Sequence, residues 1–219
     1  MGRVKYAARN ILFGYVSNII TLLLNAGLRY VFIMRLDETL LGINSTYTNI
    51  LSVLSLAELG VGTAINFSLY APVARHDKEK IKAYMQFYKK AYRMIAIIVA
   101  AVGLILVPFL KYIIKDPVGI DSNQDLINFY LIFLFNTVSS YFVAYKYSLP
   151  NAEQKNYIQS NVITITKITT TLVQIIVILA TSSFYGYLIS ASVIELAQKI
   201  FANIYLNQDR KSTRLNSSH

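Results

Sequence analysis

Three ionisable side chains lie well inside long apolar stretches of this sequence, where their chemistry calls for an explanation: Arg29, Glu58 and Lys167. A charge inside a bilayer is costly unless it faces protein or water, so each is a candidate functional residue. Cations at this depth would suit an anionic group such as a phosphate or pyrophosphate. Glu58 is the obvious titratable carboxylate for coupling to an ion gradient.

Polar residues recur at helical spacing in the same stretches. They are Gly14, Asn18, Thr21, Asn25 and Arg29 in the first, Ser45, Asn49, Ser52, Ser55, Glu58, Gly62 and Asn66 in the second, and Ser160, Thr164, Lys167, Thr171 and Gln174 in the third. Such faces turn away from lipid, so they converge on a hydrogen-bonded interior or on a water-filled cavity. The residues that we assign to a substrate cavity are Arg29, Lys167, Asn18, Asn25, Glu58 and Gln174.

Each polar type also has a purely structural interpretation. Ser, Thr and Asn commonly hydrogen-bond between helices, and for them alone this is the simpler interpretation. Arg29 lies close enough to the end of its stretch to extend its guanidinium to the interface. Lys167 cannot easily do so, and its alternative is a salt bridge to Glu58 or Glu195, which we weigh equally with the cavity.

Composition places the chain among membrane proteins. It has 219 residues, of which 55% are hydrophobic, and long uncharged runs recur along it. The lack of cysteine excludes disulfides and thiolate chemistry, and two histidines are too few for a His-rich metal site. The glycine motifs that bind nucleotide phosphates are also missing from the sequence. We therefore expect no cofactor, no metal, no catalytic residue and no enzymatic activity.

The hydropathy pattern predicts an all-α polytopic membrane protein with six transmembrane helices: 11–34, 40–71, 94–114, 126–149, 157–181 and 184–206. The second would reach roughly 48 Å, against the ~30 Å that the hydrocarbon core needs. It must tilt, project or bend, and Gly60 and Gly62 mark where a bend is easiest. Pro108 predicts a kink in the third helix, Pro150 ends the fourth, and Ser182 and Ser183 predict a tight turn after the fifth.

Basic residues set the expected orientation. The net charge of +10 is clustered at segment ends, which indicates membrane topology rather than nucleic-acid binding. Lys and Arg concentrate before the first helix and between the second and third, so both ends of the chain are predicted to be cytoplasmic. The stretch Arg75–Arg93 fits an amphipathic helix lying on anionic membrane lipids, and nearly as well a solvated loop.

The last eleven residues, 209–219, resemble the in-frame translation of a common short-read sequencing adapter: DRKSTRLNSSH. Scars of this kind are excluded from fold reasoning. Native sequence is then expected to stop at Gln208, with the rest of the natural protein missing.

Two longer stretches carry a family resemblance. They are LGINSTYTNILSVLSLAELGVGTAINFSLYAPVA, which is followed by a Lys-rich segment ending in FYKKAYR, and YKYSLPNAEQKNYI at the junction of the fourth and fifth helices. Together they resemble the N-terminal region of bacterial polysaccharide-export flippases, in the multidrug/oligosaccharidyl-lipid/polysaccharide exporter superfamily. The resemblance covers about residues 1–208 and rests on long hydrophobic patterns rather than on a catalytic signature.

The resemblance implies one six-helix lobe of a two-lobed, MATE-like flippase fold, with the C-terminal lobe of the same chain missing. It implies transport of a lipid-linked oligosaccharide, on its pyrophosphate lipid carrier, across the bacterial cytoplasmic membrane by alternating access. The sugar-pyrophosphate headgroup would pass through a cationic cavity between the lobes. Arg29 and Lys167 fit that role by chemistry and position, although they match no fixed motif of the family.

Three other functions stay open from the sequence. A multidrug or cation extruder of the same superfamily would favour a net acidic cavity rather than one with mid-membrane cations. A membrane glycosyltransferase or polymerase of cell-surface polysaccharide synthesis needs carboxylates outside the membrane. Its candidates would be Asp37, Glu38, Asp116, Asp121 and Asp125, which fit solvated loops or helix caps more simply. A structural subunit without transport is weakly disfavoured by the polar faces.

Overall fold

The computed structural model describes the backbone of residues 2–114 and 122–215, and the side chains of 18–56, 62, 64, 67–114 and 122–207. Every regular element in these ranges is a helix, so the predicted all-α class is confirmed. The six long helices are α1 (Gly2–Leu36), α2 (Glu38–Ala74), α3 (Lys78–Leu106), α5 (Asn123–Ala144), α7 (Asn156–Thr181) and α8 (Phe184–Leu215). The short elements are η1 (Val107–Phe109), α4 (Leu110–Ile113), η2 (Tyr145–Tyr147) and α6 (Ser148–Ala152).

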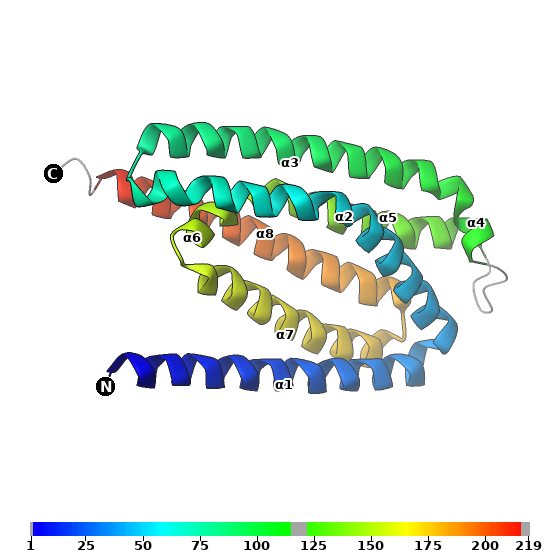
Figure 1. Cartoon of the computed structure of the whole chain (residues 1–219). Coiled ribbons are helices and arrows are strands. Elements are labelled where there is room, and N and C mark those ends of the chain that lie inside the picture. The colour runs from blue at the N-terminus through cyan, green and yellow to red at the C-terminus, as the bar shows by residue number, and fades with distance from the viewer. Residues whose placement is uncertain (1, 115–121, 216–219) are drawn as a thin grey trace.

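The long helices alternate in direction along the chain and stand side by side in one elongated bundle (Figure 1). Contacts connect α1 to α7, α7 to α8, α8 to α5, α5 to α3 and α3 to α2, and α2 also touches α5 and α6. Consecutive α1 and α2 meet at their shared turn and diverge from it (Figure 1). The first helix is therefore held mainly by α7, a helix far from it in sequence.

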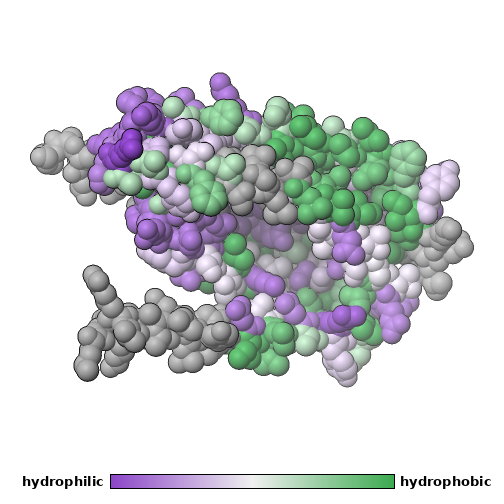
Figure 2. Space-filling model, viewed as in Figure 1, coloured by the Kyte–Doolittle hydropathy of each residue, from purple (hydrophilic) through white to green (hydrophobic). Residues whose placement is uncertain are grey.

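Among the described residues, four helical stretches are long and apolar enough to cross a membrane: Asn18–Leu36, Lys78–Ile113, Asn123–Ala152 and Asn156–Thr181. Many large apolar side chains on them point outward, as lipid-facing residues do, and Ile97, Ile165 and Ile176 are strongly exposed. Figure 2 shows apolar residues over one half of the visible face and polar residues gathered at the other end. Passage of α2 and α8 through a membrane remains a prediction.

The basic segment 78–93 is neither a separate surface helix nor a loop. It forms the first half of α3 and continues directly into the third predicted span. Tyr88 and Tyr92 are buried in a cluster with residues of α2 and α5, which holds this half of α3 in the bundle. Asp77 caps the helix by accepting a hydrogen bond from the Lys80 backbone N–H at 3.1 Å, and this bond lowers the pKa of the Asp77 carboxyl.

Prolines and glycines account for the other differences from the predicted boundaries. Pro108 lies in η1, so the predicted irregularity in the third helix is confirmed. The fourth predicted helix ends early, at Ala144, and Pro150 lies inside the short helix α6. In the first turn of a helix, Pro loses no hydrogen bond, because the N–H there has no partner within the helix. The helix α2 continues through Gly60 and Gly62 without interruption, so no break divides it into shorter segments.

In the described backbone, four non-glycine residues at the short turns between helices have positive φ: Asp37 (100°), His76 (53°), Gln154 (61°) and Ser182 (46°). Each carries a backbone cost of about 1–3 kcal/mol. Ser182 ends α7 in the left-handed conformation and its N–H donates to the carbonyl of Ile178. The predicted tight turn before α8 is therefore confirmed.

Two apolar clusters hold the bundle, one near each end. The first surrounds the α1–α2 and α7–α8 turns and includes Phe32, Ile43, Leu126, Ile178 and Phe184. The second joins α2, α3, α5 and α6 and includes Leu69, Tyr92, Ile95, Tyr141 and Ala152. Tyrosine hydroxyls inside these clusters bridge helices rather than anchor an interface, since Tyr47 donates to Leu126 O at 2.9 Å and Tyr130 to Gly103 O at 3.1 Å.

Candidate functional site

The polar face predicted on α1 points out of the bundle. Asn18, Asn25 and Arg29 are exposed, whereas Phe32 is buried and packs edge-to-face on Phe184 and Tyr187 at centroid distances of 5.8 and 5.1 Å. The aromatic contact fixes the rotation of α1 near its C-terminal end. Three of the predicted cavity residues therefore share the outside of this bundle rather than its interior.

Polar residues in the first half of α2 are also exposed, and their hydroxyls do not join helices. Ser45 donates to its own helix at Leu41 O (2.9 Å), and Ser52 donates to Thr48 O (2.7 Å). Such bonds satisfy the hydroxyl locally and leave the side chain free of any neighbouring helix. Ser55 is an exception, because it accepts the Tyr141 hydroxyl at 3.0 Å. The interhelical interpretation therefore fails for Ser45 and Ser52, and the side chains of Glu58 and Asn66 lie outside the described residues.

A shallow pocket of about 350 Å³ lies where this face meets α5. Its lining mixes hydroxyl and apolar groups: Thr48, Leu51, Ser52, Ser55, Leu56, Phe133 and Thr137. The pocket has no charged residue in its lining and is too shallow to enclose a ligand by itself. It marks the edge of the α2 polar face rather than a separate site.

The two candidates on α7 have different environments. Lys167 is exposed, and no described carboxylate lies within ion-pair distance of it. Glu195, one of its two predicted partners, pairs instead with Lys199 at 3.6 Å. Gln174 is buried and donates to the Tyr187 carbonyl at 3.4 Å, so it links α7 to α8 instead of lining an open face.

Glu58 lies in α2, but its side chain is outside the described residues. Its pairing with Arg29 or Lys167, and its role in ion coupling, therefore stay predictions. The helices α1 and α7 run in the same direction (Figure 1), and Arg29 lies closer to the end of its helix, Leu36, than Lys167 does to the end of α7, Thr181.

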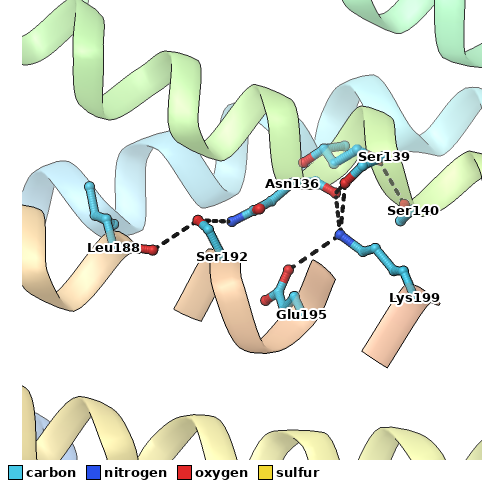
Figure 3. Close-up of polar contacts among 8 residues, drawn as sticks. Asn136, Ser139, Ser140, Leu188, Ser192, Glu195 and Lys199 are labelled. Atoms are coloured by element: carbon cyan, nitrogen blue, oxygen red, sulfur yellow. Dashed lines mark hydrogen bonds and ion pairs between the residues drawn. The ribbon is translucent and has the colours of Figure 1, made fainter. Parts of the chain in front are cut away.

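The most extensive polar network lies elsewhere, between α5 and α8, and sequence reasoning did not identify it. At its centre, Lys199 Nζ donates to Asn136 O at 2.9 Å and to Ser139 Oγ at 2.8 Å (Figure 3). One turn away, Asn136 Nδ2 donates to Ser192 Oγ at 2.9 Å. Glu195 completes the group by pairing with Lys199, as the i,i+4 spacing predicts. We call these residues, with the flanking bonds described next, the α5–α8 seam.

Further hydrogen bonds extend the seam towards both ends of the helices. Near one end, Tyr185 donates to Asp125 Oδ1 at 2.6 Å and accepts from Asn128 at 3.1 Å. Near the other, the buried Lys146 donates to Asn203 and to Asn207, the latter at 2.8 Å. The sequence signal was present, since Asn128, Asn136 and Ser139 of α5 and Lys146 of η2 lie towards one helical face. The seam is a set of interhelical bonds rather than an open site.

Two of the carboxylates that an enzyme would need have structural roles, while a third, Glu38, is exposed. Asp37 caps α2 by accepting from the Glu38 N–H, and Asp125 accepts the Tyr185 hydroxyl. Within the described part of the chain, no group of three or more His, Cys, Asp or Glu residues is placed to hold a metal ion. Asp116 and Asp121 lie outside the described residues.

No family model, curated protein or solved structure matches this chain. The resemblance to polysaccharide-export flippases therefore stays a prediction carried by the sequence stretches quoted above. Geometry contributes a separate observation: Arg29, Lys167 and the amides of Asn18 and Asn25 are exposed, while most polar groups between α5 and α8 are bonded to each other.

Proposed function

We propose that this chain is one six-helix lobe of a flippase, and that α2 and α8 cross the membrane with the four apolar spans. Its substrate is a lipid-linked oligosaccharide with a pyrophosphate carrier, moved across the bacterial cytoplasmic membrane by alternating access. The N-terminus lies in the cytoplasm. A further lobe of the same protein covers the polar faces of α1, α2 and α7 and encloses the path.

The exposure of polar residues on membrane-crossing helices carries this proposal. Asn18, Asn25 and Arg29 lie in a candidate span yet face outward, and Lys167 does the same on the neighbouring helix. Lipid solvates such groups poorly, so they need water or another protein surface. A water-filled path between two lobes supplies both.

The sign of the charge favours an anionic substrate over a cationic drug. The paired helices α1 and α7 contain no Asp or Glu at all, so Arg29 and Lys167 have no carboxylate on either helix to neutralise them. They lie on two neighbouring helices, where each can contact a moving headgroup. Charge-assisted bonds to phosphate oxygens are the interaction that such cations make best.

Charge removal tests the proposal. Arg29→Gln and Lys167→Gln, introduced into the full-length protein, are each expected to lower export of lipid-linked oligosaccharide at least tenfold with unchanged protein abundance in the membrane. Arg35→Gln is the matched control, because Arg35 is also exposed on α1 but lies in its last turn. It should retain export within about twofold.

Three outcomes would overturn the assignment. Wild-type export by both Arg29→Gln and Lys167→Gln, at normal abundance, would remove the cationic path. Loss of resistance to cationic drugs with intact export of oligosaccharide would favour the multidrug extruder. Formation of new glycosidic bonds by the purified protein would instead favour the glycosyltransferase or polymerase.

A further inference from the structure

A second cationic feature lies at the opposite side of the bundle from α1. A pocket of about 940 Å³ opens between the first half of α3, the segment formed by η2 and α6, and the C-terminal half of α8. Tyr141 and Tyr145 of the α5–η2 segment belong to its lining together with Lys146. This pocket is distinct from the path proposed above, because it contains no residue of α1, α2 or α7.

Cations dominate the lining of this pocket. They are Lys78, Lys82, Lys89 and Arg93 from α3 and Lys146 from η2. Two carboxylates are also present, Glu79 and Glu153, and Glu153 is already paired with Lys155 at 2.9 Å. Together with Met85, the α3 cations recur every three or four residues and therefore lie on one face of the helix. This face forms one wall of the pocket.

The deepest cation is held in place by the opposite wall. Lys146 is 7% exposed, and its ammonium donates to Asn203 and, at 2.8 Å, to Asn207 of α8. These bonds orient the ammonium group from beneath while the flexible lysines of α3 line the other side. The pocket is thus a built concavity with a fixed positive charge, and not only a run of surface lysines.

The position of α3 places the pocket at the headgroup level of a bilayer. Residues 94–113 are free of charge except Lys111, and as a helix they span about 30 Å, the thickness of the hydrocarbon core. With that segment in the core, Arg93 and Lys89 lie at the interface, and Lys82 lies about 10 Å farther out along the helix, on the water side of the headgroups. Phe142, Leu149 and Leu206 give the lining an apolar part that an acyl chain can contact.

We propose that this pocket binds an anionic phospholipid, with the phosphate between Lys89 and Arg93, Lys82 at the water-side rim, and the acyl chains along its apolar lining. The combination of several cations with apolar side chains at interface depth fits an amphiphile, whereas a free phosphate would use only the cations. The site is therefore a discrete lipid-binding site, which replaces the predicted helix lying flat on anionic lipids. It is independent of the proposed transport function.

Titration of single lipids into the full chain in neutral detergent micelles tests this site. The probes are phosphatidylglycerol, phosphatidylcholine and soluble glycerol phosphate, and native mass spectrometry measures the bound fraction. Phosphatidylglycerol is expected to bind at least tenfold more tightly than phosphatidylcholine. Glycerol phosphate, which lacks acyl chains, should fail to displace it at equal concentration.

The matched variants separate the pocket from general surface charge. Lys82→Gln/Lys89→Gln removes two pocket cations, and Lys80→Gln/Lys90→Gln removes two cations of the same helix that do not line the pocket. The first pair of substitutions should weaken the binding of phosphatidylglycerol at least tenfold, and the second pair should weaken it at most twofold. Helix content, measured by circular dichroism, should be unchanged in both variants. Equal losses of phosphatidylglycerol binding in the two double variants would overturn the proposal. So would full displacement of phosphatidylglycerol by glycerol phosphate. Arg93→Gln is the substitute if the first pair fails to fold.

Discussion

The α5–α8 seam and the outer faces of α1 and α7 contain similar residue types in different settings. In the seam, Lys199 and Asn136 bond to each other's helices and are largely enclosed. On the outer faces, Lys167 and Asn25 are exposed, and no described carboxylate pairs with Lys167. The same side chain therefore stabilises the fold in one place and is available to a ligand in the other.

This difference separates two uses of polarity in a membrane protein. A buried lysine with its carbonyl, hydroxyl and carboxylate partners holds two helices in one register, although the bonds themselves contribute modestly. An outward lysine on a span contributes nothing to packing and needs water or a further protein surface. A substitution that lowers the free energy of unfolding in the seam should consequently leave that free energy unchanged when it is made at a matching residue of the outer faces.

The largest contrast is expected from reversal of charge. Lys199→Glu would place a carboxylate beside Glu195 and against the Asn136 carbonyl, in a side chain position that is 9% exposed. An unpaired buried charge costs about 3–5 kcal/mol, so the free energy of unfolding should fall by that amount. Lys167→Glu should change it by less than about 0.5 kcal/mol.

Unfolding by sodium dodecyl sulfate in mixed micelles, followed by circular dichroism, measures both effects. The double variant Glu195→Gln/Lys199→Glu serves as a control, since it removes the like-charge neighbour and should recover part of the loss. Equal losses for Lys167→Glu and Lys199→Glu would mean that α7 packs against a surface absent from the described bundle.

Glycines extend the comparison to packing. Gly103 of α3 is buried against α5, and a Cβ there would overlap Leu134 Cδ1. Gly103→Ala is therefore expected to lower the free energy of unfolding by about 1–3 kcal/mol, because Leu134 is itself enclosed. Gly27 of α1 has open space around its Cα, so Gly27→Ala should raise it by up to about 1 kcal/mol. Thermal unfolding in detergent checks both signs.

Much of the fold was predictable because its signals are local. Apolar length and periodicity located the long helices, and Pro108 and the Ser182–Ser183 turn were identified correctly. The basic half of α3 was misplaced because its apolar face, which includes Tyr88 and Tyr92, was assigned to a lipid surface, whereas it packs on α2 and α5. Pairings such as α1 with α7 and α5 with α8 join segments far apart in sequence, and no local pattern specifies them.

The candidate site was predictable only in part, since periodicity defines a helical face but not what covers it. Lys167 and Gln174 share one predicted face of α7, yet the first is exposed and the second buried. Gln174 lies nearer the turn where α7 and α8 meet, and Lys167 lies two turns farther from it. Asn136 was overlooked, and the sequence assigned Lys199 only to its i,i+4 partner Glu195, because no local pattern links α5 to α8.

Amides give the next contrast. Asn136→Leu removes the bond to Ser192 at 2.9 Å and should lower the free energy of unfolding by about 0.6–1.7 kcal/mol, the range for interhelical bonds in membranes. Asn25→Leu, a matched change on α1, should leave it within about 0.5 kcal/mol. It should instead reduce oligosaccharide export, so the two variants are expected to fail in opposite assays. If Asn25→Leu lowered the free energy of unfolding and Asn136→Leu reduced only export, the roles of the two regions would be exchanged.

Hydroxyls give the smallest contrast and the most specific test of the seam. Ser192→Ala removes the acceptor for Asn136 and should cost about 0.6 kcal/mol, while Ser52→Ala should cost almost nothing because Ser52 bonds only to its own helix. If Asn136 and Ser192 act through one shared bond, Asn136→Leu/Ser192→Ala costs less than the sum of the single changes. The same cycle with Ser52 in place of Ser192 should be additive within about 0.3 kcal/mol, since distant sites do not couple. Additivity in both cycles would mean that the seam stabilises the bundle by shape alone and that its hydrogen bonds are incidental.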